Sequence, residues 1–278
     1  MVILVCVTTA PALDACLAAL DRSLPAGTRV LVADDAGGDP RVAPLAQGWC
    51  ERTRLSAHFL RRDRPYGRAR HRGYLIADHP GQDLVLLDGD ALPAPGWLER
   101  LQRCAGAHPD IATLSTWGNG AGLCSFPRFC EANPLPTSLD TLAAAAAKMD
   151  DEALPELPMA QGPCLYLRAD ALRRLGSWDS DSFEALGADA DFCHRAASMG
   201  WRNVLCPTVF VGRSESAVSE PVGDDLRRLS ARWPSHQEGL ARFLLSDPLY
   251  PLREKLTARL AEMIGAARHG GPQGDLFD

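Results

Sequence analysis

The chain has 278 residues, of which 46% are hydrophobic and 23% are charged. These fractions are ordinary for a folded globular protein and exclude disorder over most of the length. Its 29 basic and 35 acidic residues give a formal net charge of −6, which argues against a nucleic-acid-binding protein because such domains are normally basic. The length allows one large domain or two modest ones.

Hydrophobic stretches alternate with helix-like stretches in the first half of the chain. Strands are predicted at residues 2–7, 29–33, 55–60, 83–87 and 111–114, and helices at residues 11–20, 42–50, 68–78 and 95–105. Continuous hydrophobic runs are typical of strands that are buried on both faces. The sequence therefore predicts an α/β fold with a mostly parallel sheet flanked by helices.

The regular alternation ends near residue 115. Residues 116–136 are rich in glycine, asparagine, proline and aromatic residues and predict a long loop, which in a compact domain is more often functional than idle. Helices are then expected at residues 139–149, 169–175 and 189–197, and short strands at residues 164–168, 203–206 and 209–211. We expect a domain over residues 1–215, a helical extension of two or three helices over residues 216–268, and a disordered tail over residues 269–278.

Targeting signals and disulfides are not expected. The hydrophobic runs are far shorter than the roughly 18 residues that a membrane span needs, and the N-terminus lacks the pattern of a secretory signal. None of the nine cysteines forms a CxxC pair, so we expect unpaired, mostly buried thiols. These features predict a cytoplasmic protein and leave peripheral contact with the inner membrane open.

Two acidic clusters follow predicted strands, where open α/β sheets bind their ligands. Asp88 and Asp90 flank Gly89, and residues i and i+2 of an extended backbone point the same way. Two carboxylates at this spacing suit Mg²⁺ or Mn²⁺, although a solvated turn or a helix cap has the same pattern. Asp34 and Asp35 likewise fit either a turn or hydrogen bonds to a ribose or base.

A third acidic pair, Asp189 and Asp191, lies in a predicted helix. Residues two apart do not share a helix face, and Asp191 is placed to pair with Arg195 at i,i+4. Asp189, at the expected start of this helix, fits an N-cap or a general base that faces a cleft. Trp117 and Asn119 in the long loop suit sugar stacking and hydroxyl recognition, or a hydrophobic plug beneath the loop.

Five segments together resemble glycosyltransferase family 2, the inverting nucleotide-sugar enzymes with the GT-A fold. The first, residues 2–20, resembles the family's first strand and helix. Residues 30–39 (VLVADDAGGD) resemble the family's VVDDGSTD, and residues 64–73 (RPYGRARHRG) resemble NxGxxxARNxG. Residues 86–98 (LLDGDALPAPGWL) are similar to LLDxDxxxxPGWL, and residues 187–195 (GADADFCHR) to GEDxDFCxRA. The long loop and the helical end also resemble a subgroup of bacterial surface-polysaccharide enzymes.

The resemblance implies a role for each matching residue. The nucleotide would be held by Thr8, Asp34 or Asp35, Arg70 and Asp88, with residues 1–115 forming the nucleotide-sugar half and residues 116–215 the acceptor half. Asp90, with Asp88, would bind Mn²⁺ or Mg²⁺. Asp189 would be the general base, and the acceptor would meet Trp117, Asn119 and Asp191.

Two departures from the family pattern bear on activity. Ala188 stands where the family often has a second acid, and Arg213 where it often has a metal-binding histidine. Arginine has no lone pair to offer a metal, so either Asp90 and the phosphates hold the ion or Arg213 itself neutralises the diphosphate.

The expected function is transfer of a sugar from a UDP, dTDP or GDP sugar to a glycan or lipid-linked glycan, with inversion, in bacterial cell-surface polysaccharide synthesis. Two alternatives stay open: a non-catalytic nucleotide- or glycan-binding module, degenerate at Ala188 and Arg213, and a sugar-1-phosphate nucleotidyltransferase. The second would need a glycine-rich basic loop after the first strand, which residues 8–13 do not supply.

Overall fold

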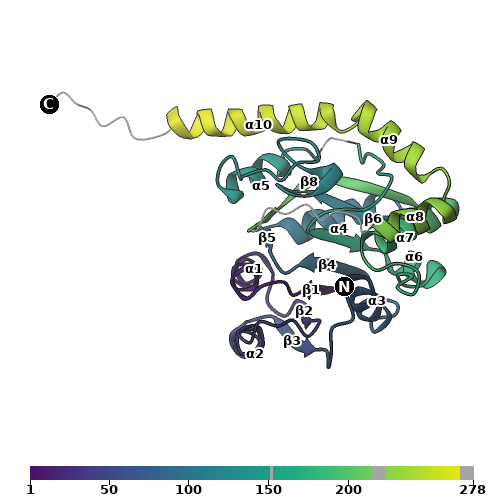
Figure 1. Ribbon diagram of the computed structural model, residues 1–278. Coiled ribbons are helices and arrows are strands. Elements are labelled where there is room, and N and C mark those ends of the chain that lie inside the picture. The colour runs from purple at the N-terminus through teal and green to yellow at the C-terminus, as the bar shows by residue number, and fades with distance from the viewer. Residues whose placement is uncertain (151–152, 215–222, 270–278) are drawn as a thin grey trace.

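A single mixed sheet forms the centre of the protein (Figure 1). The computed structural model describes residues 1–150, 153–214 and 223–269. The eight strands follow the order β3-β2-β1-β4-β7-β6-β8-β5. They are β1 (Val2–Cys6), β2 (Arg29–Asp34), β3 (Ser56–Arg61), β4 (Leu84–Asp88), β5 (Ala91–Pro93), β6 (Ile111–Trp117), β7 (Cys164–Leu167) and β8 (Arg202–Arg213). Only β7 and β5 run antiparallel to their neighbours, which confirms the predicted mostly parallel sheet.

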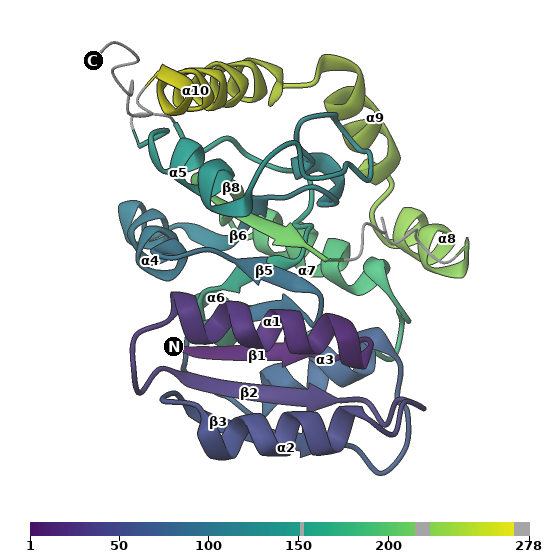
Figure 2. The same cartoon turned by 90° about the vertical axis from the view of Figure 1, so that its left-hand side faces the viewer.

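Helices cover both faces of the sheet (Figure 2). They are α1 (Ala10–Ser23), α2 (Val42–Arg52), α3 (Arg68–Ala77), α4 (Trp97–Ala107), the 3₁₀ turn η1 (Gly122–Cys124), α5 (Leu139–Ala147), α6 (Ala169–Leu175), α7 (Leu186–Ser198), α8 (Gly223–Arg232), α9 (His236–Ser246) and α10 (Tyr250–His269). Ile3 and Val5 of β1 pack towards α1, α2 and α4, whereas Leu4 packs towards α3 and α7. Alternation along each strand therefore divides the core into two layers.

The strand at residues 202–213 differs from the prediction of two short strands. Pro207 lacks the N–H that a sheet requires, so the pattern predicts a break there. The structure instead absorbs it in a bulge, because Thr116 of β6 pairs with Cys206 whereas Trp117 pairs with Phe210. The continuous strand carries its last residue, Arg213, to the same end of the sheet as the Asp88–Asp90 turn, since Ala91 pairs with Arg213.

The C-terminal part contains the predicted helices α8, α9 and α10, with α10 lying along α5 (Figure 1). The predicted boundary at residue 215 and most of the predicted tail, residues 270–278, lie outside the described residues, and His269 belongs to α10. None of the helices in the described ranges combines the length and apolarity that crossing a bilayer would demand.

One expectation about the cysteines is wrong. Cys104 on α4 and Cys206 on β8 form a disulfide, with their Cα atoms 6.1 Å apart. The two residues are 102 positions apart in sequence and show no paired spacing, so only the packing of α4 on β8 brings them together. Cys6, Cys16, Cys124, Cys164 and Cys193 are the expected buried free thiols.

A partly buried and a buried histidine, His194 and His236, join α7 to α9 and make folding pH-dependent. His194 Nε2 and His236 Nδ1 lie 2.8 Å apart. Burial lowers the pKa of both rings below the ordinary value; Asp191 opposes this at His194, while the charge of His194 adds to it at His236. Because the unfolded chain then binds more protons, stability is complete above a pH of about 6.5 and falls as the pH drops towards the folded pKa values.

We therefore expect a lower melting temperature at pH 5.5 than at pH 7.5, with a smaller difference in His236→Gln. Part of the difference should persist in that variant, because burial also lowers the pKa of His71. Equal pH dependence in the variant and the wild type, measured by thermal unfolding, would contradict this assignment.

Candidate active site

The Asp88-Gly89-Asp90 turn sits against the end of β1. Cys6 pairs with Asp88 across the two strands. A Cβ atom on Gly89 would lie 2.8 Å from the carbonyl oxygen of Cys6 and 2.9 Å from the backbone nitrogen of Thr8. Glycine is therefore required here by the chain's own backbone, and this packing aims Asp88 out from the strand end.

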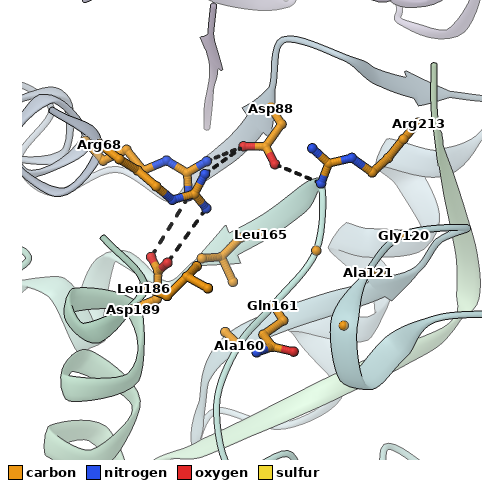
Figure 3. A pocket seen from close by; sticks show the side chains of 13 residues that line it. Arg68, Asp88, Gly120, Ala121, Ala160, Gln161, Leu165, Leu186, Asp189 and Arg213 are labelled. Carbon is orange, nitrogen blue, oxygen red and sulfur yellow. Dashed lines mark hydrogen bonds and ion pairs between the residues drawn. The ribbon is translucent and has the colours of Figure 1, made fainter. Parts of the chain in front are cut away.

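Two arginines on one face of α3 connect Asp88 to Asp189 (Figure 3). Arg72 is buried and forms an ion pair with Asp88, and its Nη1 lies 3.9 Å from an oxygen of Asp189. The Nη atoms of Arg68 lie 3.6 Å from Asp88 and 3.8 Å from Asp189. Asp88 and Asp189 thus face each other across a short bridge of guanidinium groups.

Asp189 lies in the first turn of α7, which begins three residues earlier than predicted. The indole N–H of Trp178 donates to its Oδ1 at 2.7 Å. The helix has no N-cap side chain of its own; instead Asp225 of α8 accepts hydrogen bonds from the backbone N–H groups of Glu184, Ala185 and Gly187. The Asp225 carboxylate therefore does the work of a cap and fixes the turn that carries Asp189.

Arg213 reaches the same site from the end of β8. Its Nε and Nη2 donate to the two oxygens of Asp90 at 2.9 and 3.0 Å, and its Nη1 lies 3.2 Å from Asp88. The backbone N–H of Arg213 donates to Asn119 Oδ1 at 2.7 Å, which fixes the strand end. Planar two-point pairing of this kind sets both the position and the orientation of a guanidinium group.

The charges of these residues balance closely. Burial raises the pKa of Asp88, but Arg72, Arg68 and Arg213 outweigh it, so the pKa lies below the ordinary value and Asp88 is ionised. Burial raises the pKa of Asp90, against the opposing charge of Arg213. For Arg72, burial lowers the pKa and the carboxylates more than compensate, so it stays protonated. The cleft therefore holds a fixed row of alternating charges.

The cleft itself is small. Its free volume is about 40 Å³, far below the roughly 300–1,000 Å³ of a pocket that holds a drug-sized ligand. Glycines and small side chains form its far wall, and the lining comprises Arg68, Arg72, Asp88, Gly120, Ala121, Gly122, Ala160, Gln161, Gly162, Leu165, Leu186, Asp189 and Arg213. Arg68 makes its ion pairs only at 3.6 and 3.8 Å, and its side chain is 30% exposed, so its displacement is the simplest way to enlarge the cleft.

Comparison with known proteins decides the family. Residues 1–176 match the family described as "Glycosyl transferase family 2". The chain belongs to glycosyl transferase family 2. It is a glycosyltransferase, which confirms the resemblance predicted from the five sequence segments. No curated protein sequence matches the chain.

Solved structures confirm the GT-A fold of this family 2 glycosyltransferase. The mannosyltransferase PcManGT from Pyrobaculum calidifontis, in complex with GDP-Man and Mn²⁺, superposes with a TM-score of 0.58 at 19% identity, covering 98% of this chain and 76% of that one. GalNAc-T7 with UDP, GalNAc and Mn²⁺ gives 0.63 at 13% identity, and this chain spans 58% of it. S. aureus TarS 1-349 in complex with UDP-GlcNAc gives 0.52 at 16%, covering 98% and 93%.

The nucleotide residues expected in this glycosyltransferase fall into two groups. Thr8 is exposed beside the Gly89 turn, next to the cleft. Asp35 accepts hydrogen bonds from the backbone N–H groups of Tyr66 and Gly67, and Asp34 accepts one from Gly37 while pairing with Arg61. Asp34 therefore takes part in its own turn, and a nucleotide contact by Thr8, Asp34 or Asp35 stays a prediction.

Arg70 does not reach the cleft. It is exposed and pairs with Asp181 at 3.3 Å, because residues 68 and 72 share one face of α3 and residue 70 points elsewhere. Arg68 and Arg72, which line the cleft, were not predicted from the sequence as site residues. Their i,i+4 spacing behind a glycine was the available signal, but three arginines at alternate positions do not show which face a helix buries.

The structure places the three expected acceptor residues outside the cleft, and an acceptor contact by any of them stays a prediction. Asp191 is fully buried and accepts hydrogen bonds from Arg195, Arg232 and Trp233. Trp117 is fully buried in a hydrophobic cluster with α5 and α10. This agrees with the alternative in which Trp117 packs as a hydrophobic plug. Asn119 is 1% exposed and supports the backbone of Arg213. None of the three lines the cleft.

The expected metal site at Asp88 and Asp90 is filled by the guanidinium group of Arg213. Mn²⁺ is present in two of the compared structures. In the described part of this chain, no group of three or more histidine, cysteine, aspartate or glutamate residues could hold a metal ion. Both oxygens of Asp90 already accept N–H groups of Arg213, so the residues as placed do not fit an ion held by Asp90. The expectation of Mn²⁺ or Mg²⁺ at Asp88 and Asp90 stays a prediction.

Proposed function

We propose that this glycosyltransferase moves a sugar from a nucleotide-diphosphate sugar to a hydroxyl group of a glycan acceptor, with inversion at the anomeric carbon. The observation that carries the proposal is the pair Asp88 and Asp189, facing each other across the guanidinium groups of Arg68 and Arg72. Asp88 lies at the end of strand β4, and Asp189 lies on helix α7. A sugar held between them would present its two faces to groups of different role.

The donor would bind along the ends of β1, β2 and β4. Thr8 and Asp35 lie on the side of the nucleoside, and the diphosphate would replace carboxylates as the partner of Arg68. Exchange of one anionic partner for another keeps the buried guanidinium groups neutralised, which avoids the cost of an unpaired buried charge. Displacement of Arg68 would also provide space that the closed cleft lacks.

Asp189 would act as the general base. Trp178 holds one carboxylate oxygen, and the other, 3.8 Å from Arg68, would accept the proton of the acceptor hydroxyl once Arg68 moves to the diphosphate. As that proton leaves, the acceptor oxygen bonds to the anomeric carbon and the bond from this carbon to the diphosphate oxygen breaks. A positioned base of this kind contributes about 10²–10⁴-fold in rate.

Arg213 would supply positive charge for the departing diphosphate. It is held by Asp90 in two-point contact and touches Asp88, so it occupies the place where the sequence analysis expected a cation. Preorganised positive groups aimed at a developing anion commonly contribute the largest share of catalysis. A bound divalent ion, where one is present, would add the same kind of charge stabilisation to the leaving group.

The proposal includes the biological setting suggested by the sequence, namely bacterial cell-surface polysaccharide synthesis with an acceptor presented on the cytoplasmic side. The compared structures contain GDP-Man, UDP with GalNAc, and UDP-GlcNAc, so donors of the UDP and GDP type come first, followed by dTDP sugars. The non-catalytic alternative, suggested by Ala188 and Arg213, is an outcome of the same experiment.

The test combines binding with turnover. Thermal unfolding with UDP, GDP and dTDP, and with their sugars, should raise the melting temperature for one nucleotide class. At a ligand concentration 100 times Kd the gain is about 2.7 kcal/mol, or roughly 5–10 °C for a chain of this size. The sugar donor of that class should then release nucleoside diphosphate when glycan acceptors are added. Binding without release on any acceptor would support the non-catalytic module instead.

A further inference from the structure

A second cavity adjoins the cleft and is used by none of the chemistry above. It lies between η1, the start of α7, and helices α8 and α9, and its free volume is about 220 Å³. Gly122, Gln161 and Leu186 line both this cavity and the cleft. Leu186 lies beside Asp189, across the cleft from Asp88 (Figure 3). The cavity therefore opens from the acceptor side of the site.

The walls of this cavity are hydrophobic. Leu123, Met159, Ala190 and Leu229 are buried in its interior. At its rim Leu226 and Leu244 are 39% and 41% exposed, although leucine in these positions gains nothing from contact with water. Two leucines that frame a hydrophobic hollow are expected where an apolar ligand completes the packing.

The polar side chains around the cavity are already engaged. Asp225 accepts three backbone N–H groups of the turn before α7, and His236 Nδ1 bonds to His194. Gln161 Oε1 accepts the backbone N–H of Leu123 at 2.9 Å. A sugar placed here would lose hydrogen bonds to water without finding replacements, whereas a hydrocarbon chain is stabilised by removal of its surface from water.

We propose that this cavity binds the hydrocarbon portion of a lipid-linked acceptor, while the sugar of that acceptor enters the cleft at Asp189. The inference rests on the proposed function and narrows its acceptor from glycans in general to those on a lipid. The shared wall favours this occupant, because one molecule with a polar head and an apolar tail could reach from the cavity into the cleft once Arg68 has moved. Leu245 and Tyr250 near the α9–α10 junction are 90% and 56% exposed but do not line the cavity.

The same helix that lines the cavity also fixes the base. Leu226 and Leu229 of α8 form the wall, and Asp225, next to them in sequence, caps the turn that carries Asp189. Filling the cavity would therefore restrict movement of α8 relative to α7, and with it movement of the turn that carries Asp189. The acceptor tail is thus placed to contribute both affinity and alignment of the hydroxyl group with its base.

Binding is the first test, because it does not depend on turnover. Decyl and methyl glycosides that carry the same sugar would be compared by calorimetry, below the micelle concentration of the decyl compound. We expect at least tenfold tighter binding of the decyl glycoside. Leu244→Trp, which fills the rim, should remove this preference, and Leu226→Trp should do so independently if the first variant folds poorly. Leu245→Trp, the matched control next to the cavity, should keep it.

The second test uses transfer to the same glycosides. The wild type and Leu245→Trp should show a lower KM for the decyl acceptor, and Leu244→Trp should show equal KM values for the two. Equal binding of the two glycosides by the wild type would overturn the inference, as would an undiminished preference in both filled variants. Donor hydrolysis without any chain-length effect would overturn the inference alone, whereas tight decyl binding without any donor turnover would overturn only the proposed transfer.

Discussion

Replacement of Asp189 by asparagine is expected to reduce sugar transfer by about 10²–10⁴-fold, the contribution of a positioned base. Asparagine keeps the shape of the side chain and can still accept the indole N–H of Trp178 at Oδ1. It cannot take a proton from the acceptor, because the amide has no basic oxygen. Nucleoside diphosphate binding should survive, since Arg68 and Arg72 lose an anionic competitor for the phosphates. Turnover tests the expected loss of transfer, and thermal shift on the same preparation tests whether nucleoside diphosphate binding survives.

Asp191→Asn is the matched control, two residues further along α7. Asp191 is fully buried and pairs with Arg195 and Arg232, so the variant should melt at a lower temperature. Its folded fraction should nevertheless turn over at close to the wild-type rate, since Asp191 does not line the cleft. If Asp191→Asn lost transfer while Asp189→Asn kept it, the assignment of the base would be reversed.

The sequence predicted the sheet and the cleft edge because those features depend on local pattern. Hydrophobic strands that end in acidic residues are visible one segment at a time, and the ends of parallel strands meet at one edge. Asp88 was predicted as a site residue in this way, whereas Asp189 was predicted from its place near the start of a helix and from the family resemblance. The predicted position of Asp189 at the helix start was inaccurate, because α7 is capped by Asp225 from another helix and no local signal marks its beginning.

Features that depend on contacts between distant segments were not predictable. Trp117 and Asn119 looked suited to sugars, but their partners, the α5–α10 cluster and the end of β8, lie far away in sequence. The Cys104–Cys206 disulfide is set by the packing of α4 on β8. Arg68 and Arg72 were overlooked because the sequence does not tell which side of an arginine-rich helix faces a carboxylate. The hydrophobic cavity is lined by residues from η1 and the loop after it, from the segment around Met159 and Gln161, and from α7, α8 and α9, so no local sequence pattern predicts it.

Arg213 provides the most direct test of how the diphosphate is neutralised. If Arg213 supplies the charge, wild-type transfer should persist in EDTA at a rate close to that with Mn²⁺. Arg213→His should reduce transfer in EDTA by about 10²–10³-fold, the usual cost of removing one preorganised group that stabilises a developing anion. Imidazole can ligate a metal, as arginine cannot, so Mn²⁺ should restore part of the activity of this variant. Rates with and without chelator, for both proteins, are the measurement.

Two controls separate this effect from a loss of folding. Arg213→Ala leaves the buried Asp90 without its partner, so it should cost about 3–5 kcal/mol of stability and show no rescue by Mn²⁺. Arg61→His removes the arginine from a comparable pair with buried Asp34, 2.9 Å apart and outside the cleft, and should leave transfer in EDTA unchanged. Abolition of wild-type transfer by EDTA, with recovery on adding Mn²⁺, would instead mean that Asp90 exchanges Arg213 for a metal ion when the donor binds. The Arg213 guanidinium group would then occupy the metal position only while no donor is bound, and would take no part in the reaction.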